Sequence, residues 1–229
     1  AVHSLLDERR CTPLALKIKK TILQNGYLDL SQYMSMCLYD SEYGYYVKQP
    51  ILGTSGDFTT APEISQIFGE LIGVWCSIVW EQMNAPDCIH LVELGPGRGM
   101  LMLDALRATK INSQFRNSLS VHLVELNSSL AQIQKETLRD CDLPLRWHSS
   151  LETIPHGPTL LFANEFLDTC PVRQQIVYQD FCFERRVGVD NQDRLVFLAQ
   201  EKDGSLVPRF SGDNIMYIQE FQNHSVLLN

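Results

Sequence analysis

Apolar residues recur along this chain with different periods, and each period predicts a different kind of element. Near the N-terminus, the segment from Thr12-Pro13 to Gly26 has the start and stop signals of a helix around helically spaced apolar residues. A second, amphipathic helix is predicted from Pro62 to about Met83. Its apolar positions are Ile64, Ile67, Phe68, Leu71, Ile72, Trp75, Ile78 and Val79.

Three short apolar runs follow at the intervals expected when strands alternate with helices. They span 89–94, 120–126 and 159–163, and helical segments at 100–109 and 128–139 separate them. This alternation predicts an α/β fold with a parallel sheet. Beyond the third run, alternating β-like runs predict antiparallel strands or a hairpin appended to the sheet. Those runs are Gln174–Phe183, Arg185–Val189 and Arg194–Ala199.

Composition excludes more function classes than it indicates. The 229 residues are 45% hydrophobic, enough for one α/β domain with a sizeable core. A net charge of -8 disfavours a broad nucleic-acid interface, and no apolar run is long enough to cross a bilayer. Seven cysteines without a C-x-x-C pair argue against a disulfide framework or a thiolate zinc site, so we expect no metal and a reducing, intracellular compartment.

The two ends of the sequence carry few signals. The first residues have no signal-peptide layout, although a targeting peptide removed earlier stays open. The segment 213–229 ends without a turn or a cap, so we expect that the C-terminal part is truncated or not contiguous.

The first predicted strand runs into three alternate glycines and then a helix. In Ile89-His-Leu-Val-Glu-Leu-Gly-Pro-Gly-Arg-Gly99, glycines allow a sharp turn and let a ligand approach the main chain, while the next helix offers its N–H groups. The spacing is G-x-G-x-G, whereas a nicotinamide dinucleotide fingerprint requires G-x-G-x-x-G. Gly95, Gly97 and Gly99 are therefore candidate residues for binding another cofactor.

Two glutamates lie at the ends of the first two predicted strands. Glu93, two residues before Gly95, could hold the amino group of an amino-acid-like ligand directly or through water. Glu125 ends the neighbouring strand, where a carboxylate can accept both hydroxyls of a ribose. A glycine turn alone could equally be a tight connection with no ligand, but its combination with two acids favours ligand binding.

The third predicted strand leads directly into Asn164, Glu165 and Asp168, which are candidate catalytic residues. Asp168 would share a side with the other two if the turn becomes helical. The alternative is a capping and turn cluster, because Asn and Asp favour helix starts. Isolated histidines near strand ends, such as His122 and His148, are more often structural than catalytic.

A polar, aromatic and glycine-punctuated stretch from Asp40 to Thr60 is interpreted as a long ordered loop, and such loops usually carry function. Within it, Gly56, Asp57 and Phe58 are candidate cofactor-binding residues, with Phe58 forming a wall of the pocket. The alternative is structural: the neighbouring acid Glu63 would be a first-turn residue of the next helix, where the helix dipole favours an acid.

At these residues the sequence resembles the MidA-like methyltransferases, a family once catalogued as a domain of unknown function. The resemblance covers about residues 12–190, and its most specific block is Gly56-Asp-Phe-Thr-Thr-Ala-Pro-Glu-Ile-Ser65. It implies S-adenosylmethionine as the methyl donor and protein arginine methylation as the activity. Other matching segments are Tyr43-Gly-Tyr-Tyr46, Phe68-Gly-Glu-Leu-Ile-Gly73, Leu91–Gly99 and Ala163–Asp168.

The resemblance also implies the organisation of the chain. We expect a class I Rossmann-like methyltransferase sheet with helices on both faces, an N-terminal helical extension and a small β-rich insertion after the fourth strand. The expected segments are 1–62 with the N-terminal helices and a substrate or cofactor loop, 63–172 as the S-adenosylmethionine-binding core, and 173–229 as the β-rich insertion with an incomplete C-terminal part. His148 is included among the cofactor-binding residues, next to Ser149, which replaces an acid that the family carries for adenine recognition.

Mitochondrial members of that family help assemble respiratory complex I. The resemblance therefore implies an arginine-bearing protein substrate, with a location in the mitochondrial matrix of a eukaryote or the cytoplasm of a bacterium. No nucleic-acid partner and no membrane insertion are expected, and a homodimer stays open. The alternative functions are a non-catalytic assembly chaperone that retains the donor pocket and a small-molecule methyltransferase.

Overall fold

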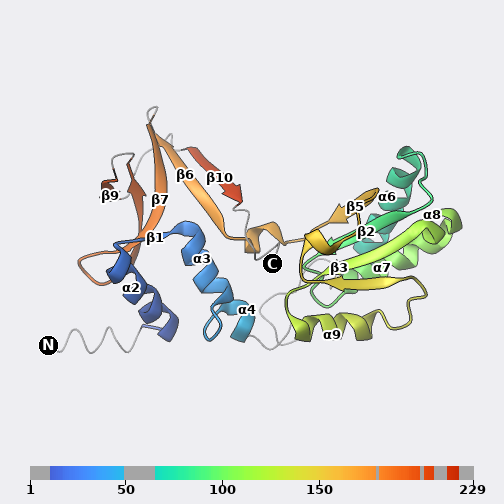
Figure 1. Ribbon diagram of the computed structural model, residues 1–229, viewed down its shortest axis with the longest axis horizontal. Helices are drawn as coiled ribbons and strands as arrows, with labels where there is room; N and C mark the ends of the chain where they lie inside the picture. Colours follow the sequence, from blue (N-terminus) through green and yellow to red (C-terminus); the bar gives the residue numbers. More distant parts are fainter. Residues whose placement is uncertain (1–10, 49–64, 179–180, 202–203, 209–215, 222–229) are drawn as a thin grey trace. The chain divides into compact units, whose positions relative to one another are not determined.

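The computed structural model describes residues 11–48, 65–178, 181–201, 204–208 and 216–221 of the chain (Figure 1). The chain divides into two compact units, with one boundary at residues 168 and 169. One unit contains the parallel sheet and its helices, and the other combines the N-terminal helices with the β-rich segment.

Four parallel strands form the sheet of the first unit, in the order β4-β3-β2-β5 (Figure 1). β2 (Ile89–Leu94) pairs with β3 (Leu119–Val124) on one side and with β5 (Thr159–Phe162) on the other. The parallel sheet and the three strands expected from sequence are thereby confirmed. The edge strand β4 (Leu145–His148) was not expected, because its four side chains are exposed or half-buried and form no apolar run.

Helical segments connect the parallel strands, and they place the residues that follow β2, β3, β4 and β5 at one edge of the sheet. The amphipathic helix expected from Pro62 to Met83 is observed as α6 (Gln66–Gln82), which precedes β2. The others are α7 (Met100–Ala108), η1 (Thr109–Ile111) and α8 (Ser113–Ser118) before β3, α9 (Ser128–Thr137) before β4, η2 (Leu151–Thr153) before β5, and η3 (Leu167–Thr169) after β5.

The larger core of this unit lies between one face of the sheet and helices α6, α7 and α8. Leu91 of β2 and Leu123 of β3 are fully buried there, together with Met102 of α7 and Phe115 of α8. Burying each of these side chains contributes roughly 1.5–3 kcal/mol. A smaller apolar cluster on the opposite face includes Val92, packed with side chains from η2 and from the turn after β5.

Glycines allow α6 and α7 to pack at close range. A Cβ atom at Gly69 would lie 2.6 Å from the Cβ of Asp104, and one at Gly73 would overlap the carbonyl oxygen of Ala105. The second obstacle is backbone, which can give way only if one helix moves. Residue 73 must therefore be glycine for the two helices to keep this separation.

Three histidines form a hydrogen-bonded row across β2, β3 and β4. His90 Nδ1 lies 3.0 Å from His122 Nε2, and His122 Nδ1 lies 2.8 Å from His148 Nε2. The Thr153 hydroxyl donates to the carbonyl of Ser150, so it accepts a hydrogen bond from Nδ1 of His148 at 2.8 Å. Burial, assisted by the neighbouring histidines, lowers the pKa of His122 to about 4, so this central histidine is neutral near pH 7.

The second unit packs helices on an antiparallel sheet. Helix α2 (Pro13–Asn25) begins after Thr12, whose hydroxyl accepts a hydrogen bond from Ala15 N, and ends at Gly26 with a φ of 86°, as the sequence predicts. The sheet order is β10-β6-β7-β8-β9, and the short β1 pairs with β7. The remaining elements are β1 (Leu28–Asp29), α3 (Leu30–Tyr39), α4 (Tyr45–Lys48), β6 (Val172–Tyr178), β7 (Phe181–Val189), β8 (Leu195–Gln200), β9 (Leu206–Pro208) and β10 (Met216–Phe221).

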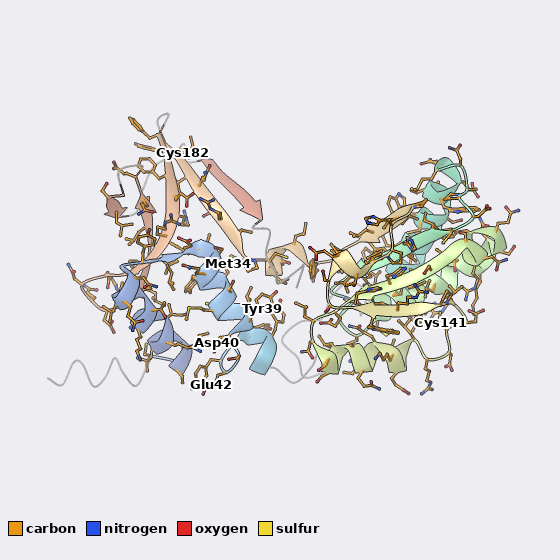
Figure 2. All side chains as sticks on the ribbon, in the orientation of Figure 1. Met34, Tyr39, Asp40, Glu42, Cys141 and Cys182 are labelled. Atoms are coloured by element: carbon orange, nitrogen blue, oxygen red, sulfur yellow. The ribbon has the colours of Figure 1, made fainter. Side chains whose placement is uncertain are left out.

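The antiparallel strands expected after residue 171 are confirmed, but they form a sheet of their own and do not extend the parallel one. Their core joins Ile18 and Ile22 of α2 to Val187 of β7. Asp40, which follows α3 and is labelled in Figure 2, accepts a hydrogen bond of 2.5 Å from Lys17 of α2. Tyr39 donates to the carbonyl of Thr169 at 3.0 Å, which ties α3 to the segment before β6.

All seven cysteines lie within the described residues and are free thiols; Cys141 and Cys182 are labelled in Figure 2.

Among the helices of the described ranges, none combines the length and the apolarity that a bilayer crossing requires.

The close crossing of α6 and α7 predicts that Gly73→Ala lowers the free energy of unfolding by about 1–3 kcal/mol, because the added methyl group forces the helices apart. Chemical denaturation measures this change. Gln82→Ala, at an exposed position of the same helix, is the control and should stay within about 0.5 kcal/mol of the parent. Equal stability of the Gly73 and Gln82 variants would contradict the close packing.

Candidate functional site

The turn from β2 into α7 is built from left-handed backbone. Gly95, Gly97 and Gly99 have φ angles of 60°, 55° and 83°. Residues with a side chain rarely adopt such angles, so the three alternate glycines that the sequence contains are the residues this turn requires. The turn is also fixed to the next strand, because Gly95 N donates to the carbonyl of Val124 at 3.1 Å.

The loop after β5 packs against this turn. A Cβ atom at Gly95 would lie 2.5 Å from Cδ2 of Phe166, so the ring fills the space that a side chain would need. Phe166 directly follows Asn164 and Glu165, two of the candidate catalytic residues. The contact therefore brings their segment next to the glycine turn.

Glu93, at the end of β2, is a buried carboxylate without a full set of partners. Its exposed fraction is 2%, and no described residue forms a hydrogen bond with its Oε2 atom. Burial raises the pKa of this carboxyl to about 8. A buried polar atom left without a partner destabilises a fold by about 1–3 kcal/mol, so its retention beside a glycine turn points to a ligand that supplies the missing donor.

Glu125 directly follows β3 and lies half-buried at the same edge of the sheet. Its Oε1 accepts a hydrogen bond from Asn127 N at 2.8 Å, and its Oε2 accepts one from Gln134 Nε2 at 3.1 Å. Burial raises the pKa of the Glu125 carboxyl, while these hydrogen bonds oppose the rise. Its backbone N–H donates to the carbonyl of His148, which fixes the residue between β3 and β4.

Gln134 is a residue of this site that the sequence analysis missed. Its side chain is fully buried, with an exposed fraction of 0%, and reaches Glu125, the carbonyl of Gly97 and the indole of Trp147. A signal was available: positions 130, 134 and 138 lie on one face of the predicted helix, and a glutamine stands there between two leucines. A polar residue at a core position of a helix needs internal partners.

The candidate catalytic residues lie in the turn after β5. Asn164 is half-buried and Glu165 is exposed, with a φ of 47° that is unusual for a residue with a side chain. Asp168 is exposed and belongs to the short helix η3. The structure thus brings Asn164 and Glu165 to the edge that carries Glu93 and the glycines, and their chemical roles stay predictions.

The remaining predicted cofactor-binding residues are His148, Gly56, Asp57 and Phe58, and their roles stay predictions. Both ring nitrogens of His148 form hydrogen bonds within the protein, to His122 and Thr153, so the ring supports the sheet and has no nitrogen left for a ligand in this arrangement. Gly56, Asp57 and Phe58 lie outside the described residues, and so does Glu63. In the part of the chain that the structure describes, no group of three or more His, Cys, Asp or Glu side chains is arranged to hold a metal ion.

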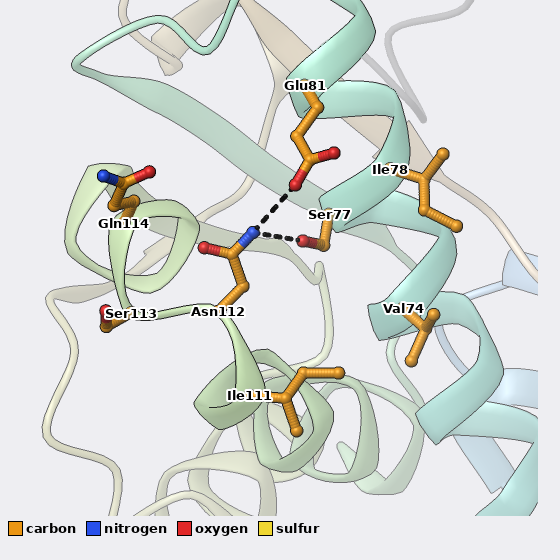
Figure 3. Close-up of a pocket in the computed structure, with 8 residues that line it drawn as sticks. All are labelled: Val74, Ser77, Ile78, Glu81, Ile111, Asn112, Ser113 and Gln114. Atoms are coloured by element: carbon orange, nitrogen blue, oxygen red, sulfur yellow. Dashed lines mark hydrogen bonds between the residues drawn. The ribbon is translucent and has the colours of Figure 1, made fainter.

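A separate hollow of about 470 Å³ lies between α6 and the segment of η1 and α8 (Figure 3). Asn112 donates there to Ser77 at 3.0 Å and to Glu81 at 3.2 Å. None of the residues that line it is a predicted site residue, so it does not belong to the site at the edge of the sheet. The lining residues are Val74, Ser77, Ile78, Glu81, Ile111, Asn112, Ser113 and Gln114.

The sequence of this chain matches a known protein family. The model of a family described as "Putative S-adenosyl-L-methionine-dependent methyltransferase" matches residues 71–221, more than half of the chain. The chain belongs to this family. The match includes the glycine turn, both strand-end glutamates and the segment after β5, whereas the block from Gly56 to Ser65 lies before it.

Relatives of this methyltransferase family are similar over most of the chain. The Danio rerio protein named protein arginine methyltransferase NDUFAF7, mitochondrial, is 34% identical, and the match covers 89% of this chain and 52% of the relative. The Homo sapiens protein of the same name is 36% identical, with 73% and 43% covered. The chain thus spans about half the length of the curated relatives it matches.

Two crystal structures of proteins from Burkholderia thailandensis share the fold of this chain. One protein, described as a candidate methyl transferase and bound to S-adenosyl-homocysteine, is 27% identical with a TM-score of 0.66, and the match covers 82% of this chain and 49% of that one. The other is 26% identical with the same TM-score, covering 92% of this chain and 55% of that one. The α/β class with a parallel methyltransferase sheet is therefore confirmed.

The raised pKa of Glu93 predicts how its replacement changes stability with pH. The folded state holds this proton up to about pH 8, whereas the ordinary pKa of a glutamate is about 4.5, so the folded protein loses stability as the pH rises between these values. Glu93→Gln removes that loss. In the absence of ligand, we expect the variant to gain stability over the parent from pH 5 to pH 8, as chemical denaturation at each pH would show. A difference that shrinks as the pH rises would contradict this account.

Proposed function

We propose that this chain binds S-adenosylmethionine at the edge of the sheet where β2 and β3 end, and that it serves the methylation of arginine in a partner protein. One observation carries the proposal: the buried Glu93 carboxylate, with an oxygen for which no described residue provides a donor, lies beside three left-handed glycines. This combination fits a ligand that presents a cationic amino group and must approach the main chain closely.

Different described residues would contact different parts of the proposed methyl donor. Glu93 would hold the amino group, and Glu125 would hold the two ribose hydroxyls. The backbone at Gly97 would lie against the ligand, while the Phe166 ring occupies the space beside Gly95. The bound ammonium group would also stabilise the charged form of Glu93 and lower its raised pKa, so the ligand would relieve the cost of burying this carboxylate.

The donor supplies an activated methyl group on a sulfonium, and the protein has to orient the acceptor for an in-line transfer. An arginine guanidinium carries its charge across a planar fork, which a carboxylate can orient through paired hydrogen bonds. Glu165 and Asp168 are exposed acids after β5, and Asn164 lies half-buried beside them. We assign them to the orientation of that guanidinium.

The unusual backbone of Glu165 supports this assignment. A left-handed residue with a side chain costs of order 1–3 kcal/mol and is retained where the surrounding structure requires it, often at functional sites. The Phe166 ring, packed against Gly95, holds the same turn in place. Glu165 is thus fixed at the edge that would carry the donor.

The relatives' names supply the choice of acceptor and location. Several are named protein arginine methyltransferases and mitochondrial. We therefore extend the proposal to an arginine-bearing protein substrate and, for a eukaryotic source, to mitochondria. The proposal also links this chain to the assembly of respiratory complex I and includes a homodimeric state.

Transfer of a labelled methyl group tests the proposal. S-adenosylmethionine with a tritiated methyl group is incubated with the full chain and a lysate of the source organism, and labelled proteins are digested to locate the methylated residue. We expect label on arginine. Glu165→Gln should lower labelling by about 10²-fold, with an affinity for S-adenosylhomocysteine within about threefold of the parent. Glu152→Gln, at an exposed acid of the same unit, is the control and should label normally.

Each contrary outcome of this experiment identifies a different error. A chain that binds S-adenosylhomocysteine but labels nothing would favour the non-catalytic assembly chaperone. Label in a low-mass product would indicate a small-molecule methyltransferase. A chain that does not bind S-adenosylhomocysteine in calorimetry would contradict the donor site itself.

A further inference from the structure

Gln134 of α9 connects three parts of the site through one side chain. Its Nε2 donates to the carbonyl oxygen of Gly97 at 2.8 Å and to Oε2 of Glu125 at 3.1 Å. Its Oε1 accepts a hydrogen bond from Nε1 of Trp147 at 3.0 Å. Every polar atom of this fully buried amide is therefore engaged.

The partners of Gln134 permit only one orientation of its amide. The indole N–H of Trp147 can only donate, so it requires the amide oxygen on its side. The carbonyl of Gly97 can only accept, so it requires the amide nitrogen on the other side. One N–H group is thus directed to the glycine turn, and the second is directed to Glu125.

Counting lone pairs shows what this arrangement leaves on Glu125. Each carboxylate oxygen accepts about two hydrogen bonds. Oε1 already accepts one from Asn127 N, and Oε2 accepts one from Gln134. The backbone N–H of Leu126 also interacts with this carboxylate, so at most one accepting position remains on each oxygen. Two hydroxyls on adjacent carbons of a ribose require that number.

We propose that Gln134 is a positioning residue for the donor, which holds the Glu125 carboxylate and the Gly97 turn in register so that both ribose hydroxyls reach Glu125. The inference rests on the proposed function, because it requires a ribose at Glu125. Gln134 acts through Glu125 and is assigned no contact with the reacting atoms. A purely structural glutamine would satisfy Trp147 and stabilise α9 without any effect on which ligand the site prefers.

Ligand preference separates these two roles. Calorimetry of the full chain compares S-adenosylhomocysteine with its 2′,3′-dideoxy analogue, which lacks both ribose hydroxyls. Gln134→Met keeps the length and apolar stem of the side chain and removes the amide. Gln132→Met is the matched control, because it makes the same change at an exposed position of the same helix.

The parent and the Gln132 variant should prefer S-adenosylhomocysteine over the dideoxy analogue by at least about tenfold. Gln134→Met should bind S-adenosylhomocysteine at least about tenfold more weakly, with binding of the analogue changed by less than about threefold, so that the preference is lost. In a Glu125→Ala background, Gln134→Met should change the affinity by less than about threefold, because the group it positions is gone.

A second variant, Trp147→Phe, tests the inference even if Gln134→Met does not fold. Trp147→Phe removes the N–H that orients the amide and leaves Gln134 in place, so it should also reduce the preference. If Gln134→Met or Trp147→Phe weakens both ligands equally and the preference remains, Gln134 is only a packing residue and the inference is wrong. If the parent binds neither ligand, the proposed function fails, and the inference fails with it.

Discussion

Three residues with left-handed backbone within five positions take the chain from β2 into α7, and the rest of the site is arranged around that turn. Because Gly95 lacks a side chain, the Phe166 ring can pack against it and hold the segment that contains Asn164 and Glu165. Because the turn ends at the first residue of α7, the helix begins where β2 and β3 end. The carboxylates of Glu93 and Glu125 therefore lie near the glycine turn.

The site contains polar groups that a fold selected only for stability would avoid. Glu93 is buried with an oxygen for which no described residue provides a donor, and Gln134 occupies a core position that a leucine could fill. Such groups are costly unless another molecule or a complete internal network satisfies them. Gln134 has its network within the protein. In the proposed function the ligand supplies the donor that Glu93 lacks, so replacing this carboxylate would weaken binding and stabilise the free protein.

Sequence patterns predicted the part of the fold in which each element carries its own signal. The runs at 89–94 and 120–126 were recognisable as strands because a central strand of a parallel sheet is apolar along most of its length. The run at 159–163 was recognisable because its residues are apolar, although β5 lies at the edge of the sheet. The spacing of the glycines and the positions of Glu93 and Glu125 at the ends of predicted strands were enough to select them as candidate residues. β4 was missed because an edge strand of four residues that contains Arg146 and His148 has no such run.

Long-range pairing was the other part that sequence could not provide. β1 consists of two residues and pairs with β7 more than 150 positions later, so no local pattern indicates that the N-terminal helices join the β-rich segment. The row of His90, His122 and His148 also depends on the register of three strands, which a one-residue shift would disrupt. Gln134 was overlooked for a different reason: its hydrogen-bond partners lie outside its own helix.

A crystal structure of the full chain with S-adenosylhomocysteine tests the central claim most directly. The account predicts that both ribose hydroxyls lie within about 3 Å of the Glu125 carboxylate oxygens and that the ligand's amino group lies within about 3 Å of Glu93. It also predicts that the ligand lies against the backbone of Gly97. A structure in which Glu125 faces solvent, or in which the ligand lies away from the glycine turn, would contradict it.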